Sequence, residues 1–384
     1  MRISLISAHF YPSNVYGGPI SLTWDLSRKL AEKNIQVYVS TTNANGKSKL
    51  DVEINTFTKI NKNLYIKYYN EQIVNKFSLA FISNIYDDIK FSDLIYIQYI
   101  FHYTVLISLI FSFFLKKKII ICPRGSISNY SVENKNHLIK KIWLRFLIAP
   151  FKKKIIFQAS SDLEKNDILN FLPKSNTRIL NDPIDFDSFQ KFKTYDREKL
   201  IFKFTKMNFN YVSKIFFSMG RLHSIKRFDV LINAFSLFIM KNPNAKLIIA
   251  GNDDGVEHEL KTQIKRLNLQ KTVFLVGSVN FRIKNILLNN CDYFTLASDY
   301  ESFGIVIAEA LACGKPIIVS NKTCWKDLKE NNCGIFVDNE KRSFAKAFKH
   351  IMKKKFDSKK IKLYAKSNFD LNLITDKFLK QILK

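Results

Sequence analysis

The sequence predicts two doubly wound α/β domains, and three observations support this prediction. The chain has 384 residues, more than one domain usually contains, so two domains of similar size are expected. Short β-branched runs alternate with helix-length stretches in both halves, which is the order of a parallel sheet with crossover helices. The strand runs are apolar on both faces, as they are where helices cover both sides of a sheet.

The first half contains five strand-like runs rich in Ile and Tyr, at residues 3–7, 35–40, 94–98, 119–122 and 155–159. Helix-length stretches lie at residues 19–33, 105–115, 135–149 and 161–171. Residues 103–115 are nearly all apolar and are followed by three lysines, yet this run of 13 residues is shorter than the ~20 residues that a membrane span needs. We therefore expect a buried helix there, with membrane contact through the lysines left open.

The second half repeats this order. Strands are expected at residues 215–219, 246–250, 273–276, 293–296, 316–320 and 334–337, and helices at 228–240, 257–267 and 304–313. Residues 186–214 are polar and weakly periodic, so we place the domain boundary near residue 195, which gives domains 1–195 and 196–384. The tail, about 359–384, is expected to form one or two helices, and packing of this tail back onto the N-terminal domain is one option.

The composition limits the partners and the compartment. Lys and Arg total 61 against 33 Asp and Glu, and the net charge of +28 attracts nucleic acid, anionic lipid or phosphorylated substrates. The start, MRISLISAHFYPS, lacks the long apolar core of a secretory signal, so a cytoplasmic protein is expected. The cysteines are odd in number and lack metal-ligand spacing, which predicts thiols: Cys122, Cys291, Cys313, Cys324 and Cys333.

The stretch ESFGIVIAEALACGKPIIVS combines a helix start with two acids. The strand at 293–296 leads to a helix beginning about Gly304, whose first amide groups face the open carboxyl edge of the sheet and form an anion site. Glu301 precedes the first turn and Glu309 lies within the helix, so both can face one ligand. Helix amides for phosphate and two acids for hydroxyl groups suit a sugar nucleotide. Two glutamates on a solvated helix face are the alternative.

A second stretch, FFSMGRLHSIKRFDVLINAF, places two cations at the end of a strand. Gly220 and Arg221 follow the strand, and Lys226 precedes an amphipathic helix. Two cations five residues apart can clamp a diphosphate and neutralise a leaving group. Taken alone, two such cations are more often solvated loop charges, but together with the acidic helix they indicate one pocket.

These motifs resemble a known family. GRLHSIKRFDVLINAF, KLIIAGNDDG, VFLVGSV and ASDYESFGIVIAEALACGKPIIVS are similar, in order, to the C-terminal domain of retaining glycosyltransferases of family 4, also called group 1, across residues 214–340. HFYPSNVYGGPISLTWDLSRKLAEKNIQVYVST, CPRGSIS and NDPIDFDSF resemble landmarks of its N-terminal half. The resemblance implies the GT-B architecture, with two Rossmann-like domains facing a cleft, the N-terminal one binding acceptor and the C-terminal one donor.

The resemblance also implies roles for individual residues. Glu309 matches the acid that binds the donor ribose, Glu301 the one that contacts the transferred sugar, and Arg221 and Lys226 the diphosphate clamp. The matching backbone positions are Phe303, Gly304 and Ile305 for phosphate and sugar, Gly17 and Gly18 for the loop that closes on the donor, and Gly251 and Gly277 beside the nucleotide.

Two further residues have weaker matches. Many relatives carry histidines where Tyr96 and Gln98 stand here, and the nearby His102 is a candidate contact to acceptor or donor sugar and a candidate catalytic residue, with a packing role as the alternative. Arg124 is a candidate for the acceptor or for phosphate.

The implied function is transfer of a sugar, with retention of configuration, from a nucleotide-diphosphate sugar to a glycan or lipid-linked acceptor. Two cations and a helix terminus absorb the charge of the leaving diphosphate, so neither a cofactor nor a divalent metal is expected. The string Asp185-Phe186-Asp187 is accordingly expected to form an interdomain turn and not a metal site.

The setting that fits this function is synthesis of a bacterial surface polysaccharide such as O-antigen, capsule or exopolysaccharide, at the inner face of the membrane. Lysine clusters at 116–118, 140–141 and 152–154 suit an anionic lipid surface. Two alternatives remain. One is a GT-B enzyme that hydrolyses or epimerises a nucleotide sugar. The other is a nucleic-acid-binding protein, for which the sequence offers no helix-turn-helix pattern and no zinc-ligand spacing.

Overall fold

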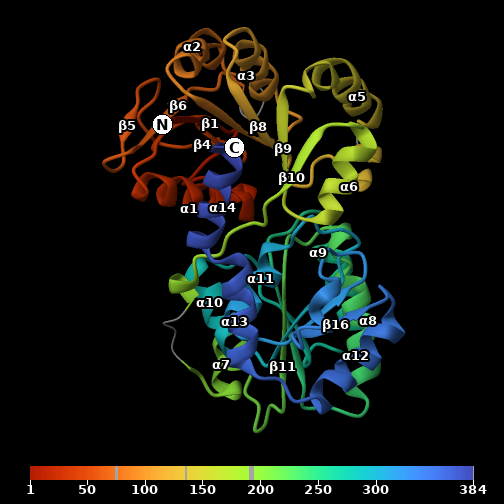
Figure 1. Cartoon of the computed structure of the whole chain (residues 1–384). Coiled ribbons are helices and arrows are strands. Elements are labelled where there is room, and N and C mark those ends of the chain that lie inside the picture. The colour runs from red at the N-terminus through yellow and green to blue at the C-terminus, as the bar shows by residue number, and fades with distance from the viewer. Residues whose placement is uncertain (74–76, 135, 190–193, 384) are drawn as a thin grey trace. The chain divides into compact units, whose positions relative to one another are not determined.

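The computed structural model describes residues 1–73, 77–134, 136–189 and 194–383, and the chain forms two compact units (Figure 1). The first unit comprises Met1–Pro183 and Leu371–Lys384, and the second comprises Ile184–Asp370. The sequence analysis placed the boundary near residue 195, whereas the units divide after Pro183. The division comes earlier because Ile184, Phe186 and Phe189 are buried in the core of the second unit. The tail is shared between the units, since only its last helix belongs to the first.

The first unit is built on a sheet of eight strands in the order β10-β9-β8-β7-β1-β2-β6-β5. Every neighbouring pair is parallel except β5 with β6. Its elements are β1 (Arg2–Ile6), η1 (Asn14–Tyr16), α1 (Gly18–Glu32), β2 (Gln36–Thr42), β3 (Ala44–Asn45), β4 (Ser48–Lys49), β5 (Thr58–Lys59), β6 (Leu64–Tyr69), α2 (Leu79–Lys90), β7 (Leu94–Gln98), α3 (Tyr103–Phe114), β8 (Lys118–Cys122), α4 (Asn129–Glu133), α5 (His137–Ile142), η2 (Trp143–Ile148), η3 (Ala149–Phe151), β9 (Ile155–Ala159), α6 (Asp162–Phe171), β10 (Asn176–Ile179) and α14 (Leu371–Leu383).

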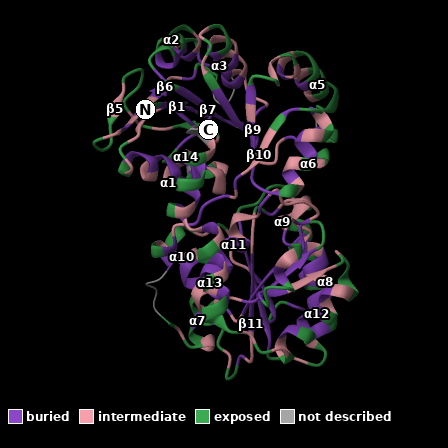
Figure 2. Cartoon of the chain, viewed as in Figure 1, coloured by how far each residue is buried: buried purple, intermediate pink, exposed green. Residues whose placement is uncertain are grey.

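Helices cover both faces of this sheet, as the apolar strands require (Figure 1). Helices α2 and α3 cover one face, where Phe81 and Leu109 pack with Ile97 and Ile121. Helices α1 and α14 cover the other, where Leu26 and Phe378 pack with side chains from the opposite faces of the same strands. The inner strands of the sheet, such as β1, β7 and β8, are therefore largely buried on both sides, as their colour in Figure 2 shows, whereas the edge strands β5 and β10 are partly exposed.

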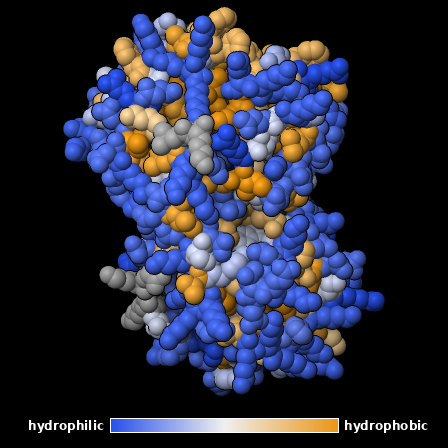
Figure 3. Space-filling model, viewed as in Figure 1, coloured by the Kyte–Doolittle hydropathy of each residue, from blue (hydrophilic) through white to orange (hydrophobic). Residues whose placement is uncertain are grey.

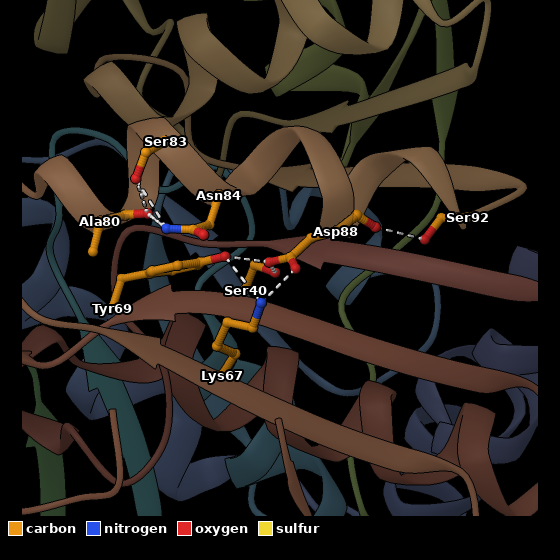
Figure 4. Close-up of polar contacts among 8 residues, drawn as sticks. All are labelled: Ser40, Lys67, Tyr69, Ala80, Ser83, Asn84, Asp88 and Ser92. Carbon is orange, nitrogen blue, oxygen red and sulfur yellow. Dashed lines mark hydrogen bonds and ion pairs between the residues drawn. The ribbon is translucent and has the colours of Figure 1, made fainter. Parts of the chain in front are cut away.

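A buried polar group fastens α2 to the sheet. The carboxylate of Asp88 accepts hydrogen bonds from Ser40 Oγ at 2.7 Å, Lys67 Nζ at 2.6 Å and Tyr69 Oη at 2.5 Å (Figure 4). Burial, and next the neighbouring Asp88 carboxylate, raise the pKa of Tyr69. The sequence analysis assigned neither β6 nor α2. The charge of Lys67 interrupts the apolar run of β6, and the acid that neutralises it lies 21 residues further on.

The helix predicted for residues 135–149 is helical from residue 137 to residue 151, but it changes from α-helix to π-helix and then to 3-10 helix along its length. Its first residue, Lys135, lies outside the described residues. Asn136 adopts a left-handed conformation with φ of 64° and starts the short helix α5. The chain continues as the π-helix η2 and then the 3-10 turn η3, in which Pro150 stands at the start and cannot donate a helical hydrogen bond.

The second unit contains a six-stranded parallel sheet in the order β13-β12-β11-β14-β15-β16. Its elements are η4 (Phe186–Phe189), α7 (Arg197–Thr205), β11 (Ile215–Met219), η5 (Ser224–Lys226), α8 (Phe228–Ile239), β12 (Lys246–Ala250), α9 (Glu257–Arg266), β13 (Val273–Leu275), α10 (Phe281–Asn290), β14 (Tyr293–Leu296), α11 (Ile305–Ala312), β15 (Ile317–Ser320), η6 (Lys326–Leu328), β16 (Gly334–Val337), α12 (Lys341–Lys353) and α13 (Ser358–Phe369). Buried residues of α8 and α12 line one face, and those of α10, α11 and α13 the other.

The prediction of two doubly wound α/β domains is confirmed, although helices α7, α10 and α12 were not foreseen. Helix α7 lies in the stretch interpreted as a linker and is tied to the strand region by Arg197, which donates to both carboxylate oxygens of Asp292 at 3.0 and 2.6 Å. The five cysteines are free thiols, as expected. Hydrophilic residues cover most of the face drawn in Figure 3, with apolar residues between them.

Candidate functional site

The second unit has a topological switch point between β11 and β14. From β11 the chain passes outward to β12 and β13, whereas β14, β15 and β16 lie on the other side. The loops after β11 and β14 therefore lead away from each other at the carboxyl edge of the sheet, where open α/β sheets bind their ligands. Both motifs singled out from the sequence lie in these two loops.

The structure brings Lys226 and Glu301 together across this point. The ammonium of Lys226 forms an ion pair with Glu301 Oε1, which also accepts a hydrogen bond from Ser298 Oγ at 2.8 Å. The side chains of Lys226 and Glu301 are 18% and 12% exposed, so the pair is largely removed from water. The backbone reinforces it, because the amide of Asp299 donates to the carbonyl of Ile225 at 2.8 Å.

Arg221 lies at the same edge but has a different partner. Its guanidinium pairs with Asp254 in the loop after β12, and its side chain is 56% exposed. Beside it, the stem of Lys226 lies against Gly220, where an added Cβ would stand 3.3 Å from Lys226 Cε. The two predicted clamp residues thus share a sheet edge, each held by an acid.

Two glycines shape the backbone of this edge. A Cβ on Gly251 would stand 1.8 Å from the carbonyl oxygen of Gly220, so only glycine lets the ends of β11 and β12 approach so closely. The amide of Gly251 donates to the carbonyl of Gly277 at 2.8 Å, and Gly277 has φ of +71°. Gly251 is therefore needed for the packing of the backbone, whether or not a nucleotide binds beside it.

The start of α11 is fixed by the core beneath it. Phe303 is 2% exposed, and its carbonyl accepts a hydrogen bond from Trp325 Nε1 at 2.5 Å. Gly304 follows with φ of +80°, and α11 begins at Ile305. A helix start has amide groups without intrahelical partners, which favours an anion there. The side chain of Phe303 is a core residue, so the backbone amides of Phe303, Gly304 and Ile305 are what this segment offers a ligand.

Glu309 is paired with a lysine that the sequence analysis missed. Its Oε1 lies 2.5 Å from Lys284 Nζ, and the two side chains are 10% and 15% exposed. The Lys284 ammonium also lies 5.1 Å from the ring centre of Phe281. Since α10 itself was not predicted, no local signal marked Lys284, and its partner is 25 residues away.

The first unit has its own switch point, between β1 and β7. Gly17 follows β1 in the chain, has φ of +83° and precedes α1, which starts at Gly18. A Cβ on Gly17 would meet no atom within 4 Å, so a side chain would not clash there. Glycine is favoured because of the positive φ angle. His102 follows β7 and caps α3, with Nδ1 2.9 Å from Thr104 Oγ1.

His9, which the sequence analysis did not single out, lies beside His102. The His9 ring stacks on Tyr16 at 3.7 Å between centres and meets the His102 ring edge-on at 5.9 Å. Burial, and next the neighbouring His102, lower the pKa of His9 to about 3, and burial lowers the pKa of His102 to about 4. His9 Nδ1 and His102 Nε2 are buried without a hydrogen-bond partner among the described residues. Two neutral imidazoles thus lie at the carboxyl edge of the sheet.

Arg124 is committed to the interior of the first unit. Its side chain is 3% exposed, pairs with Asp182 and donates through Nε to Gln98 Oε1 at 3.0 Å. These contacts join the ends of β7 and β8 to the segment after β10. A ligand could reach this guanidinium only by breaking a buried ion pair, which is costly, so the structure favours a positioning role over the predicted acceptor contact.

In the described part of the chain no group of three or more His, Cys, Asp or Glu side chains is arranged to hold a metal ion. Asp185 accepts a backbone hydrogen bond from Ser188 at 3.2 Å in the turn that contains η4. Within the same residues, every helix is too short or too polar to cross a membrane.

The second unit is similar in sequence to known proteins. Residues 201–368 match the family described as glycosyl transferases group 1. Mannosylfructose-phosphate synthase from Agrobacterium fabrum is 30% identical over 122 residues, which cover 30% of this chain and 27% of that protein. An N-acetylgalactosamine-N,N'-diacetylbacillosaminyl-diphospho-undecaprenol 4-alpha-N-acetylgalactosaminyltransferase from Campylobacter jejuni is 29% identical over 221 residues, covering 56% of this chain and 55% of that one. The chain thus spans about a quarter to a half of the length of these relatives.

The whole chain resembles solved structures in fold. HepE from Anabaena, in complex with UDP, superposes with a TM-score of 0.77 at 17% identity, covering 100% of this chain and 99% of that one. The fold is therefore GT-B, as the sequence analysis expected.

Proposed function

We propose that this chain is a retaining glycosyltransferase of family 4, which moves a sugar from a nucleotide-diphosphate sugar to a glycan or lipid-linked acceptor. The observation that carries the proposal is the Lys226–Glu301 pair at the switch point of a domain that matches group 1 glycosyl transferases. A cation and an acid held side by side suit a ligand with both phosphate and hydroxyl groups.

The proposed mechanism rests on charge stabilisation. As the bond between sugar and diphosphate breaks, negative charge builds on the phosphate oxygens, and groups already oriented toward it lower the barrier. An ammonium group has three donors, so Lys226 can keep Glu301 and still donate to phosphate. Arg221 and the amide groups at the start of α11 add further positive charge at the same sheet edge.

The acids serve the hydroxyl groups of the donor. Glu309 binds the ribose and Glu301 the transferred sugar. Each carboxylate is held by one lysine through its Oε1 atom, which leaves its second oxygen to accept from a hydroxyl group. The chemistry proposed here calls on no divalent metal and no cofactor.

The first unit supplies the acceptor side. Gly17 and Gly18 are its candidate donor contacts, and the neutral imidazole of His102 can accept a hydrogen bond from a sugar hydroxyl group or donate one to it. The relative from Campylobacter jejuni carries diphospho-undecaprenol in its name. A lipid-linked acceptor in the synthesis of a bacterial surface polysaccharide, at the cytoplasmic face of the membrane, fits that relative and the net charge of +28.

Titration with a panel of UDP-, GDP- and ADP-sugars in a calorimeter tests the donor. One member should bind, and Glu309→Gln should lower its affinity about tenfold, the effect of losing one hydrogen bond to a charged group. Glu330→Gln, which changes an exposed acid of the same unit, is the matched control.

Product analysis tests the reaction. The bound donor should be turned over in the presence of acceptor, and the new linkage should keep the anomeric configuration of the donor. Release of free sugar without acceptor would identify a hydrolase. Salt-dependent binding of nucleic acid with no nucleotide-sugar affinity would overturn the proposal.

A further inference from the structure

Residues 137–148 of the first unit expose apolar side chains on the side that does not pack on the core. Leu138, Ile139, Ile142 and Phe146 are 64%, 64%, 56% and 62% exposed. They recur at intervals close to one helical turn, so they lie along one face of α5 and η2. A helix on the surface of a soluble protein usually carries polar side chains on that face.

The opposite side of the same segment is apolar as well. Leu144 and Ile148 are buried in the core with strands of the first unit, and Trp143 Nε1 donates to the carbonyl of Ile100 at 2.9 Å. The segment is thus fixed to the unit by its inner side while its outer side faces solvent (Figure 2). Large apolar side chains gathered on an exposed face indicate a docking surface.

The charge around this face is mainly positive, although Lys141 forms an ion pair with Glu133 at 2.8 Å. Residues 137–154 contain no Asp or Glu and six cations: Lys140, Lys141, Arg145, Lys152, Lys153 and Lys154. The net charge of this stretch is therefore +6. Cations interleaved with aliphatic and aromatic side chains on a short helix are the pattern of a segment that lies in the headgroup region of an anionic bilayer.

The end of α3 extends the same surface. The ring of Phe113 lies 5.1 Å from that of Phe151 in η3, which directly follows η2. Phe113 is 41% and Phe114 75% exposed, and Lys116 and Lys118 beyond them are exposed. Two segments that are separate in sequence therefore present aromatic and basic side chains next to each other.

We propose that residues 137–148, together with Phe113 and Phe114, form a docking face for the surface of an anionic lipid bilayer. The segment is too short to span a bilayer, so it lies in the membrane plane with Ile142 and Phe146 among the acyl chains and the cations at the phosphates. A second copy of this chain fits poorly, because it would place like charges opposite each other. Nucleic acid would leave the aliphatic side chains in water. Binding of this face to lipid does not depend on sugar transfer. If the proposed function holds, a lipid-linked acceptor would be reached through this surface.

Vesicle sedimentation of the full chain, without nucleotide sugar, tests the docking face. The chain should bind vesicles of phosphatidylcholine with phosphatidylglycerol, bind pure phosphatidylcholine much less, and lose affinity as salt rises. The double change Ile142→Ser and Phe146→Ser should lower the affinity at least about tenfold. The matched control is Met240→Ser with Leu363→Ser, which removes side chains that are 80% and 67% exposed on the second unit and should leave binding unchanged.

The charges are tested in the same way. Lys153→Gln with Lys154→Gln should lower the affinity about fivefold for each charge removed. Lys353→Gln with Lys355→Gln removes two exposed cations from the second unit and should have little effect. Equal losses in both pairs would mean that net charge, and not this face, binds lipid.

Other outcomes would overturn the proposal. These are equal binding to neutral and anionic vesicles, unchanged binding after the Ile142 and Phe146 substitutions, or a dimer in the ultracentrifuge that these substitutions dissociate without affecting lipid binding. Circular dichroism should match the parent for each variant. Nucleotide-sugar affinity measured without vesicles should be the same in the double variant and its parent, so failure of docking and failure of the proposed enzyme activity are separate results.

Discussion

Replacing Gly251 by alanine should disturb the site through the backbone alone. An added Cβ would stand 1.8 Å from Gly220 O and 2.8 Å from Gly220 C, whereas real contacts are not shorter than 3.0 Å. The ends of β11 and β12 must therefore separate by at least 3.0 − 1.8 = 1.2 Å. Because both opposing atoms belong to the backbone, a change of rotamer cannot relieve the clash. We expect a loss of about 3 kcal/mol in the free energy of unfolding, the upper end for overpacking.

The same displacement should reach the chemistry. Gly220 supports the stem of Lys226, and a shift of about 1 Å in a catalytic group can lower turnover about 100-fold. Urea unfolding and steady-state turnover measure the two effects. Gly255→Ala is the control for stability, because Gly255 has φ of +102° but open space around it, so only backbone strain of about 1 to 2 kcal/mol is expected. Stability within about 0.5 kcal/mol of the parent together with normal turnover in Gly251→Ala would refute the close-approach argument.

Three further predictions concern pairs and protons. In a double-mutant cycle of Lys226→Met and Glu301→Gln, each single change should lower turnover about 100-fold. The free energies of unfolding should show a coupling of about 1 to 3 kcal/mol between the two changes. A coupling near zero would exclude the pair. Asp88→Asn should lower the free energy of unfolding by about 3 kcal/mol, whereas the exposed neighbour Asp87→Asn should change it by less than about 0.5 kcal/mol in the same urea titration. Since burial lowers the pKa of His102 from 6.5 to about 4, the folded chain binds fewer protons than the unfolded one. The contribution of His102 to the free energy of unfolding is therefore complete above pH 6.5 and falls by about 1.4 kcal/mol per pH unit down to about pH 4. His102→Gln should reduce this dependence of the unfolding free energy on pH.

Much of the fold followed from local patterns. The strands of both sheets end where the sequence places glycines, cations and acids, and parallel strands bring their carboxyl ends to one edge. Arg221, Lys226 and Glu301 could therefore be assigned to one edge of a sheet before any coordinates were known. Less regular segments were not predicted correctly. Helix α7 was interpreted as a linker, and residues 135–149 as a continuous helix, because tertiary packing and not periodicity decides such stretches.

The sequence by itself determined the two doubly wound units, the edge at which the candidate site lies and the chemistry of the groups there, because hydrophobic period and glycine placement act over a few residues. Only the tertiary structure decided the partners. Lys284 meets Glu309, Arg124 meets Asp182, and His9 meets His102, across separations of 25, 58 and 93 residues. Such pairings depend on strand order and on how each helix is rotated against its sheet, which local sequence does not specify. The same reason explains why the exposed apolar face of α5 and η2 emerged only when burial was known.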